Sequence, residues 1–545
     1  MEDQLGEWAR TQYLDKYAWH FEDGTHEEWP DTARRVVKAV LGHVGMDRRR
    51  EAAHLIKLIE DRKFLPGGRY LASSGRPLHQ VQNCTLYRCE DSREGWADLV
   101  RKAIMALSTG SGIGVDYSNV RPRGSIISTT RGLATGPLSP AQMVNETARH
   151  VMSGGFRRSA IWGGLRWDHA DIFEWISIKD WSEDVRALKE KDYNAAAPLD
   201  MTNISVILND EFFEAYHNED HEKHQLARDV YKLTIEGMVT HGEPGFSIDV
   251  GKNAGETLRN ACTEITSADD SDICNLGSIN MARIDTIEEF KLAVSLGSLF
   301  LLAGTEYSDV PHDEIKVTRE KNRRLGLGLM GIHEWLIKRG YRYEMVDELR
   351  EWLEVYQQST GIAAYWADFL GISRPIKTRA IAPNGTIGII AETTTSAEPV
   401  FVAAYKRRFR GADGQTLYQY VLDPTVVRMR DQYGIDPDEI DTAYGLAYDY
   451  ERRIRFQAEL QEYVDHGISS TINLPEPLTD ETDQQLFAET LLEYLPRLRG
   501  VTAYPNGARA GQPITAVPWS LAEGQVGVTM LEDRDEQCSS GVCGV

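Results

Sequence analysis

Short apolar runs separated by amphipathic stretches restrict the fold of this chain more than any other feature. After Phe173, runs such as Asn203 to Leu208 and Pro244 to Ile248 have the length of strands. The stretches between them are amphipathic, as helices are. This alternation favours an α/β fold with mostly parallel strands. At 545 residues the chain can hold several domains or one large α/β unit.

Composition and charge narrow the class of protein. Hydrophobic residues make up 41% and charged residues 26%, which is ordinary for a globular protein and argues against disorder. The net charge of −23 disfavours a nucleic-acid partner, which a basic face would recognise, but allows a small anionic ligand in a local pocket. The longest apolar run, Leu292 to Gly304, is too short for a bilayer, and Met1 to Gln4 shows no signal region. We expect a cytoplasmic protein without membrane contact.

The six cysteines lie at 84, 89, 262, 274, 538 and 543. They are too few for a disulfide scaffold, and no pair has the Cys-x-x-Cys spacing of a closed zinc site. No metal-ligand set is therefore predicted. The spread of the cysteines indicates thiols that folding brings together.

The segment from Asn260 to Glu264 is the strongest candidate for chemistry. It places an amide two residues before Cys262 and a carboxylate two residues after it. If the segment is extended, the three side chains share one face and can meet one small molecule. The alternative is a structural thiol, because free cysteine is often buried.

A short strand is predicted around the first two cysteines. Gln82 to Cys89 is rich in strand-forming residues. Cys84 and Cys89 are five residues apart, so in a strand they face opposite sides and should not bond to each other. One of them can face a site while the other packs. The glycine-rich run from Ser108 to Gly114 that follows permits a close approach of the backbone to a ligand.

Three further stretches are candidates for binding phosphate or nucleotide. Arg121 to Ser125 and Ser153 to Ser159 combine glycines with guanidinium groups, although solvated basic turns are an equal alternative. Ala380 to Gly388 reads as a strand that runs into a turn of small residues. If a helix begins there, its free N–H groups and the Thr386 hydroxyl form an anion site. The alternative is a plain connection between strand and helix.

The ends of the chain differ from its middle. Residues 1–80 read as an N-terminal helical region, and residues 81–517 as the main domain. From about Pro518 the chain is acidic and rich in turns, so 518–545 is expected to be a mobile tail. A tail of about twenty residues reaches roughly 25 Å, which lets its terminal thiols visit a site on the body.

In their order along the chain, the motifs from Asn83-Cys84 to the final Cys-x4-Cys resemble the catalytic subunit of ribonucleotide reductase. The resemblance covers nearly the whole chain. It implies a ten-stranded α/β barrel made of two parallel five-stranded halves. The radical cysteine would lie on a finger loop inside the barrel, with the N-terminal helical layer outside.

The resemblance implies a chemical role for each of five residues of the candidate active site. Cys262 matches the thiyl-radical cysteine that removes the substrate 3′-hydrogen. Glu264 would be the base at the 3′-hydroxyl, and Asn260 would hold the ribose hydroxyls. Cys84 and Cys274 match the pair that reduces C2′ and ends as a disulfide.

The resemblance also assigns a role to the tail. Cys538 and Cys543 are similar to the shuttle that re-reduces the active-site pair by thiol exchange, with a thioredoxin- or glutaredoxin-like protein as the final reductant. Cys89 matches no catalytic position. Two alternatives remain, a thiol–disulfide redox sensor and a nucleotide-binding regulator without catalysis. A redox sensor leaves Asn260 and Glu264 beside Cys262 unexplained, and a regulator without catalysis has no need of all five reactive cysteines.

Substrate and effector positions follow from the same motifs. The implied substrate contacts are Asn83, Ser111, Gly112, Pro383, Asn384, Gly385, Thr386 and Ile387. The implied positions for a deoxynucleotide specificity effector are Asp91, Arg121, Gly155, Arg157 and Arg158. A homodimer through helices near the effector site is implied as well, and the substrate is a ribonucleoside di- or triphosphate.

The radical source is predicted from one position. Oxygen-dependent class I enzymes have two adjacent tyrosines late in the chain, whereas this chain has Tyr504 alone before Pro505. Ser470 to Pro475 and the segment around Arg157 are similar to class II enzymes. We therefore expect an adenosylcobalamin-dependent reductase. The alternative is a class I-type subunit that receives its radical from a separate metal-containing subunit.

Overall fold

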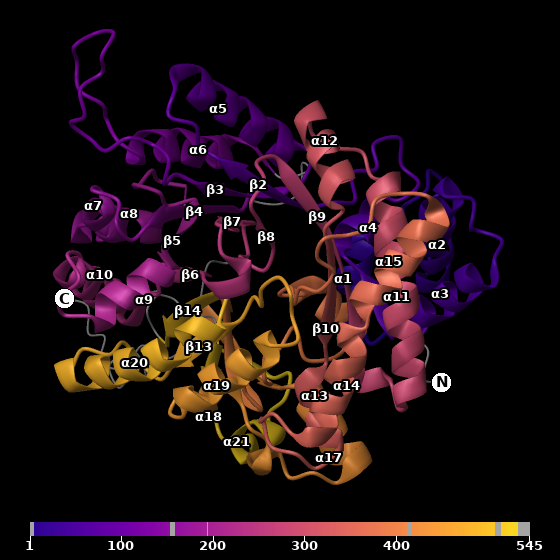
Figure 1. The fold of residues 1–545 in the computed structure, drawn as a ribbon. Helices are drawn as coiled ribbons and strands as arrows, with labels where there is room; N and C mark the ends of the chain where they lie inside the picture. The colour runs from indigo at the N-terminus through magenta and orange to yellow at the C-terminus, as the bar shows by residue number, and fades with distance from the viewer. Residues whose placement is uncertain (1–4, 153–158, 193, 411–415, 507–513, 532–545) are drawn as a thin grey trace.

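A computed structural model describes residues 5–152, 159–192, 194–410, 416–506 and 514–531 (Figure 1). No helix among these residues is both long enough and apolar enough to cross a membrane. They form a mixed α/β fold around one large sheet, as the alternation of runs predicts.

Helices dominate the first eighty residues. The elements are α1 (Glu7–Lys16), α2 (Trp29–His43), α3 (Arg50–Glu60), β1 (Phe64–Pro66) and α4 (Gly68–Ser73). The apolar stripe of α2, which includes Val36 and Val40, is fully buried and packs with the long buried helix α11 (Ile287–Tyr307). The strand β1 adds to the main sheet, which the sequence analysis did not predict.

Five consecutive strands of the main sheet are parallel. They are β2 (Cys84–Arg88), β3 (Gly112–Asp116), β4 (Ile161–Arg166), β5 (Thr202–Asn209) and β6 (Gly245–Asp249). The helices of this part are α5 (Arg93–Ser108), α6 (Leu138–His150), α7 (Ile172–Ser177), α8 (Glu183–Lys191), α9 (Asp210–His217) and α10 (His224–His241). Because helices join the strands, parallel order follows from the connections.

Antiparallel neighbours flank this run on both sides. On one side β9 (Asp272–Asn280) pairs antiparallel with β2 and parallel with β10 (Leu325–Met330). On the other, β14 (Gly500–Pro505) pairs antiparallel with β6 and parallel with β13 (Thr471–Leu474). Two single parallel bridges, Leu327 to Arg379 and Ile381 to Ile468, lie between β10 and the segment before β13.

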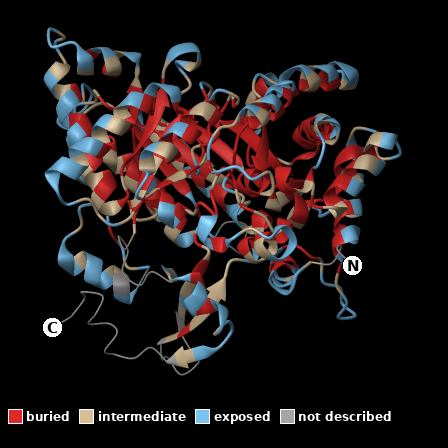
Figure 2. Ribbon diagram, turned by 90° about the horizontal axis from the view of Figure 1, so that it is seen from below, coloured by how far each residue is buried: buried red, intermediate tan, exposed pale blue. Residues whose placement is uncertain are grey.

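The remaining helices surround the second group of strands. They are α12 (Asp313–Asn322), α13 (Ile332–Lys338), α14 (Asp347–Gln357), α15 (Ser359–Leu370), α16 (Gly385–Ala391), α17 (Pro424–Tyr433), α18 (Ala443–Leu446), α19 (Tyr450–Gln461) and α20 (Glu481–Tyr494). Seen from below, the strands are buried, while the outer faces of the surrounding helices are exposed (Figure 2). The core therefore lies along both faces of the sheet.

Part of the expected mobile tail is ordered. A separate sheet holds β15 (Ile514–Ala516), β11 (Ala404–Arg410), β12 (Thr416–Leu422) and β16 (Thr529–Leu531) in that order. Between β15 and β16, helix α21 (Trp519–Glu523) buries Trp519 and Ala522. Of the expected tail, 518–545, residues 519–531 thus include a helix and a paired strand, and 532–545 lie outside the described residues. Two buried side chains and a strand pairing hold 519–531 to the body.

Candidate active site

The segment that carries Cys262 forms the tip of a hairpin. The strands β7 (Leu258–Arg259) and β8 (Thr266–Ser267) pair antiparallel, and residues 261–263 make a turn between them. The segment is therefore not extended, and the expected alternation of side chains on one face does not apply. Asn260 and Glu264 are buried, whereas Cys262 at the tip is exposed.

Glycines let this hairpin lie directly against the sheet. A Cβ atom at Gly114 would lie 1.8 Å from the carbonyl oxygen of Arg259, and one at Gly112 would lie 3.1 Å from the Cβ of Ala261. No side chain fits at Gly114 unless the hairpin moves. The glycines in the first half of β3 thus allow a close approach of backbone to backbone.

Hydrogen bonds fix the conformation of the tip. The amide Oδ1 of Asn260 accepts from the N–H of Ile265 at 3.0 Å, and the carbonyl of Glu264 accepts from the N–H of Gly467 at 2.7 Å. Thr263 has a φ of 66°, which few residues other than glycine adopt. The sequence resemblance gave Asn260 a role toward substrate, and the structure adds this role in shaping the loop.

Two cysteines face each other beside the hairpin. In the antiparallel pair of β2 and β9, Cys84 lies directly opposite Cys274. Such partners have Cβ atoms about 4.5–5.5 Å apart, so a small movement allows a disulfide. The Sγ of Cys84 lies 4.0 Å from Oε1 of Glu264. Burial raises the pKa of both thiols, and the Glu264 carboxylate raises that of Cys84 further.

Cys89 packs on the other face of the strand, as its odd offset predicts. Cys84 belongs to a small apolar cluster with Cys274 and Ile265, whereas Cys89 belongs to the large cluster between sheet and helices. Both thiols are free.

Glu264 has the properties of a proton acceptor. Its side chain is buried, and Oε2 has no hydrogen-bond partner among the described residues. Burial raises its pKa to about 7. Burial by the surrounding protein raises the pKa of the Cys262 thiol, although this thiol faces a cavity. The Glu264 carboxylate raises this pKa further. Cys262 is therefore a neutral thiol at physiological pH.

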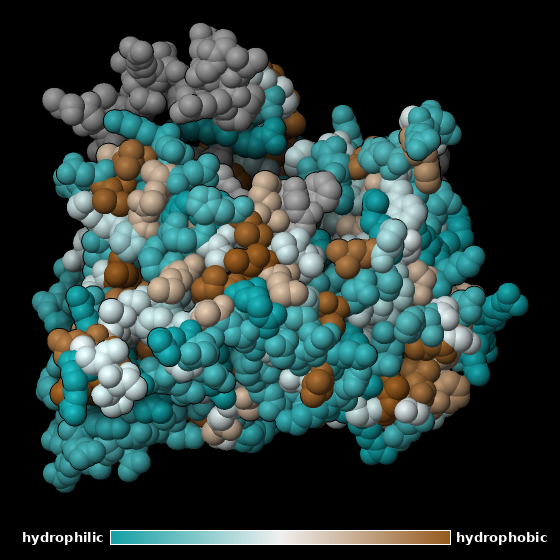
Figure 3. All heavy atoms as spheres, turned by 90° about the horizontal axis from the view of Figure 1, so that it is seen from above, coloured by the Kyte–Doolittle hydropathy of each residue, from teal (hydrophilic) through white to brown (hydrophobic). Residues whose placement is uncertain are grey.

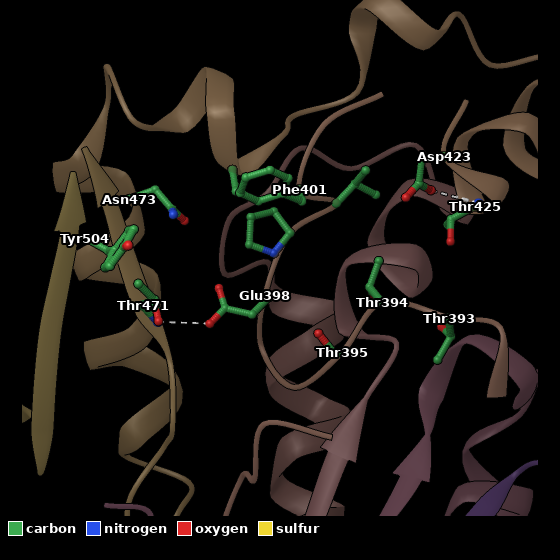
Figure 4. A pocket seen from close by; sticks show the side chains of 13 residues that line it. Thr393, Thr394, Thr395, Glu398, Phe401, Asp423, Thr425, Thr471, Asn473 and Tyr504 are labelled. Carbon is green, nitrogen blue, oxygen red and sulfur yellow. Dashed lines mark hydrogen bonds between the residues drawn. The ribbon is translucent and has the colours of Figure 1, made fainter. Parts of the chain in front are cut away.

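The cavity at Cys262 has a volume of about 280 Å³ and extends to Tyr504. A second cavity of about 540 Å³ shares Thr471 and Tyr504 with the first. In Figure 4, Asn473 and Tyr504 lie on one side of the second cavity and Phe401 lies opposite. Glu398 points toward Thr471 and accepts a hydrogen bond from its backbone N–H at 2.9 Å.

The expected phosphate loop leads into a helix. Asn384 precedes α16 with a φ of 56°, and its side chain is hydrogen-bonded to Ser278 of β9. The helix begins at Gly385, so the N–H groups of its first turn have no partner within the helix. Strand β9 also carries Cys274, so one strand connects the thiol pair to this loop.

The other expected substrate positions lie on the strands beside the hairpin. Asn83 and Gly112 are joined by a backbone hydrogen bond, and the Oδ1 of Asn83 lies 3.8 Å from the Sγ of Cys84. Ser111 is buried, and its hydroxyl is hydrogen-bonded to Thr85.

The positions assigned to effector and tail are only partly described. Asp91 and Arg121 form an ion pair of 2.6 Å beyond the ends of β2 and β3. Gly155, Arg157 and Arg158 lie outside the described residues, as do Cys538 and Cys543.

Sequence reasoning missed the polar network beneath the hairpin. Glu256, just before β7, accepts from Arg324 at 3.1 Å, from Thr266 at 2.6 Å and from Lys377. Burial opposes ionisation of Glu256, but Lys377 and Arg324 lower its pKa to about 2. These partners are 68 and 121 residues away from it. No local pattern could have joined them.

Comparison with known proteins shows similarity to ribonucleotide reductases over most of the chain. The ribonucleotide reductase barrel domain matches residues 82–230, 219–363 and 374–493. The vitamin B12-dependent ribonucleoside-diphosphate reductase of Thermoplasma acidophilum is 26% identical over 85% of this chain and 67% of its own length. The enzyme of that name in Mycobacterium tuberculosis is 26% identical over 98% of this chain and 83% of its own. A putative adenosylcobalamin-dependent ribonucleoside-triphosphate reductase of Mycobacterium phage D29 is 24% identical over 96% of both chains.

Proposed function

This chain belongs to the ribonucleotide reductase barrel family, and we propose from this that it reduces ribonucleotides to 2′-deoxyribonucleotides with adenosylcobalamin as cofactor. One observation carries the proposal. Cys84 and Cys274 are direct cross-strand partners, and Cys84 lies against Glu264 on the hairpin that presents Cys262. A redox sensor needs no such arrangement around a third cysteine.

The residues divide the reaction between them. The thiyl form of Cys262 takes the 3′-hydrogen of the ribose, and Glu264 takes the proton of the 3′-hydroxyl. Cys84 and Cys274 then supply two electrons and two protons, the 2′-hydroxyl leaves as water, and the two sulfurs form a disulfide. At the end Cys262 returns the hydrogen to C3′, and Glu264 returns the proton to the 3′-oxygen. A Glu264 pKa of about 7 suits this acid–base role.

Residues around the paired cavities would hold part of the cofactor. Adenosylcobalamin is large and bears many amide groups. The two cavities that meet at Thr471 and Tyr504 offer hydroxyls, the Asn473 amide and the Glu398 carboxylate as partners. The chemistry that the cofactor would supply when bound there is the radical that converts Cys262 to its thiyl form. The single tyrosine at 504 and the names of the relatives favour this source over a separate metal-containing subunit.

Substrate and effector are assigned as the resemblance implies. The start of α16, from Pro383 to Ile387, holds the substrate phosphates with its N–H groups. A deoxynucleotide effector binds near Asp91 and Arg121, at the end of the sheet where α5 and α6 lie. The thiols of Cys538 and Cys543 re-reduce the active-site pair and receive electrons from a thioredoxin- or glutaredoxin-like protein.

We further propose that the sheet closes into the ten-stranded barrel that the resemblance implies. The bridges Leu327 to Arg379 and Ile381 to Ile468 support this, because they connect β10 through residues 379–381 to the segment of β13. The ring then has two parallel halves of five strands. The two halves meet antiparallel at β2–β9 and at β6–β14.

The decisive experiment is an assay of the purified protein with a dithiol reductant, with and without adenosylcobalamin. We expect deoxynucleotide formation only with the cofactor, and none in Cys262→Ser. Cys538→Ser should retain one turnover, and also activity with a small dithiol. Activity that instead required a metal-containing protein subunit would contradict the cofactor assignment. Assays with ribonucleoside di- and triphosphates in parallel identify the substrate.

A further inference from the structure

The second, four-stranded sheet is basic, although the chain as a whole is acidic. Its strands are β15, β11, β12 and β16, and β11 reads Ala-Tyr-Lys-Arg-Arg-Phe-Arg. The other three strands contain no charged residue. The four strands together therefore have four basic residues and no acidic one, in a chain with a net charge of −23.

The acidic residues that flank these strands offset only part of this charge. Asp423, directly after β12, caps α17 by accepting from the backbone N–H of Thr425 at 2.8 Å. Asp413 lies in the connection 411–415, outside the described residues. Glu523 of α21, which packs on β11 and β12, is ion-paired with Arg430. When Asp413 and Asp423 are counted against the four basic residues of β11, two positive charges remain.

The basic side chains of β11 are accessible to a partner. Arg407 is exposed, and Lys406 and Arg408 are half-buried. Nη2 of Arg407 donates to Oε1 of Gln419 at 3.2 Å, and Nζ of Lys406 lies 3.8 Å from the centre of the Tyr418 ring. Gln419 and Tyr418 orient these two side chains, and both are uncharged partners.

The segment that follows this sheet in the chain has the opposite charge. Residues 532–536, outside the described residues, read Glu-Asp-Arg-Asp-Glu and come directly after β16. Because β11 and β16 both pair antiparallel with β12, they run in the same direction and end at the same edge of the sheet. Arg408 lies opposite Tyr418, which lies opposite Met530, so about 10 Å separates the backbones of Arg408 and Met530. Five extended residues span about 17 Å, which is enough to reach β11.

We propose that the acidic segment 532–536 binds to the basic strand β11 and tethers the end of the chain to the second sheet. Carboxylates form charge-assisted hydrogen bonds with guanidinium and ammonium groups. Each exposed ion pair is weak, but the segment is covalently attached beside the strand, so its effective concentration is high. Cys538 and Cys543 then extend from residue 536. The tether does not depend on the proposed function, and only its effect on thiol exchange does.

Fluorescence anisotropy of a dye joined to Val545 of the full chain tests the tether. Binding slows the rotation of the dye, so the anisotropy should be high at low salt and fall as about 0.5 M sodium chloride screens the charges. Arg407→Glu with Arg408→Glu should lower the low-salt anisotropy to the high-salt value. Adding Asp533→Arg and Asp535→Arg to this variant should restore it, because the charges are then exchanged.

A matched control separates the tether from the overall charge. Arg374→Glu with Arg455→Glu changes the net charge equally, at exposed ion pairs elsewhere on the molecule, and should leave the anisotropy unchanged. Equal anisotropy in the two double variants would overturn the tether. If the variant in β11 does not fold, the segment itself is changed, which alters no described residue. That variant should also have low anisotropy at low salt, and it combines Glu532→Gln, Asp533→Asn, Asp535→Asn and Glu536→Gln.

Cross-linking identifies the occupant of the strand. A carbodiimide joins a lysine amine to a carboxylate in contact with it, and Lys406 is the only lysine of the four strands. In the purified chain, peptide mass spectrometry should find Lys406 joined to a carboxylate of 532–536. A segment that is joined only to lysines elsewhere, or to none, would refute the proposal and leave β11 to an acidic partner protein.

Discussion

At the scale of single residues, the candidate active site is formed by residues that lie far apart in the sequence. Cys84 and Cys274 are 190 positions apart, yet they are adjacent because two strands pair in one register. A shift of that register by one residue would turn one of them to the other face of the sheet. Glu264 is distinguished from the many other carboxylates by burial, which raises its pKa to about 7.

Oxidation tests the thiol pair. When the Cys538→Ser variant, whose tail cannot re-reduce the pair, turns over once without external reductant, Cys84 and Cys274 should form a disulfide while Cys89 stays a free thiol. Alkylation of free thiols followed by peptide mass spectrometry measures this. Cys89→Ser serves as the matched control and should leave the disulfide and the yield of one turnover unchanged. A bond that includes Cys89 would contradict the assigned roles.

Activity should depend on the ionisation of Glu264. A base must be deprotonated, so kcat/KM should fall about tenfold per pH unit below pH 7. Glu264→Gln should lower kcat by about 100-fold or more and remove this dependence. Glu288→Gln on the exposed start of α11 should change neither. A profile that is flat between pH 5 and 8 would argue against Glu264 as the base.

The same carboxyl makes stability depend on pH. Its pKa is raised on folding from an ordinary 4.5 to about 7, so the native state holds the proton more tightly. Its stabilising contribution is complete below pH 4.5 and is lost as the pH rises through 7. Relative to the unmodified chain, Glu264→Gln should therefore gain about 3 kcal/mol between pH 4 and pH 8. Urea unfolding at the two pH values measures this, and a constant difference would contradict it.

At the scale of elements, the hairpin is positioned by the surfaces around it. Its own two strands pair over only two residues each, which is too little for stability in isolation. Gly114 of β3 and Gly467 let the backbone approach from two sides, and the network at Glu256 holds its base. The tip can then present Cys262 to the cavity.

Gly114→Ala should displace the hairpin. The added Cβ would lie 1.8 Å from the Arg259 carbonyl oxygen, so we expect a loss of about 2–4 kcal/mol in unfolding free energy and most of the activity. The control is Gly361→Ala in α15, where nothing lies within 4 Å. That change should stabilise the protein by about 0.5–1 kcal/mol. Denaturant unfolding and turnover assays measure both, and equal effects of the two would refute the close approach.

At the scale of the whole molecule, the surface near the proposed effector site is suited to association. Ile104 and Met105 of α5 and Met143 of α6 are exposed, and the two helices pack side by side. Seen from above, groups of hydrophobic atoms lie among a mostly hydrophilic surface (Figure 3). An effector bound near Asp91 and Arg121 would lie close to this surface, so dimerisation and specificity can be coupled.

The double variant Ile104→Glu with Met143→Glu should halve the mass measured by sedimentation equilibrium and abolish the response to deoxynucleotide effectors. Buried like charges across a symmetric contact would separate the protomers. Leu486→Glu on α20 replaces an equally exposed apolar residue elsewhere and should leave the dimer intact. A monomeric unmodified protein, or an unchanged mass in the double variant, would refute this interface.

The sequence by itself determined the family and the α/β class, and it supplied the residues that are proposed to react. Order and residue type carry that information, and the odd offset of Cys89 from Cys84 correctly predicted that the two thiols pack on opposite faces. It did not determine the conformation at Cys262, where an extended segment was expected and a hairpin turn is found, because Gly114, Gly467 and Glu256 shape it from a distance. Nor did it determine that Trp519 and β16 are held to the body. Only the tertiary structure placed Cys84 opposite Cys274, raised the pKa of Glu264 by burial and brought Arg324 and Lys377 to Glu256 beneath the hairpin. Strand register, desolvation and ion pairing arise between segments that are far apart in the chain.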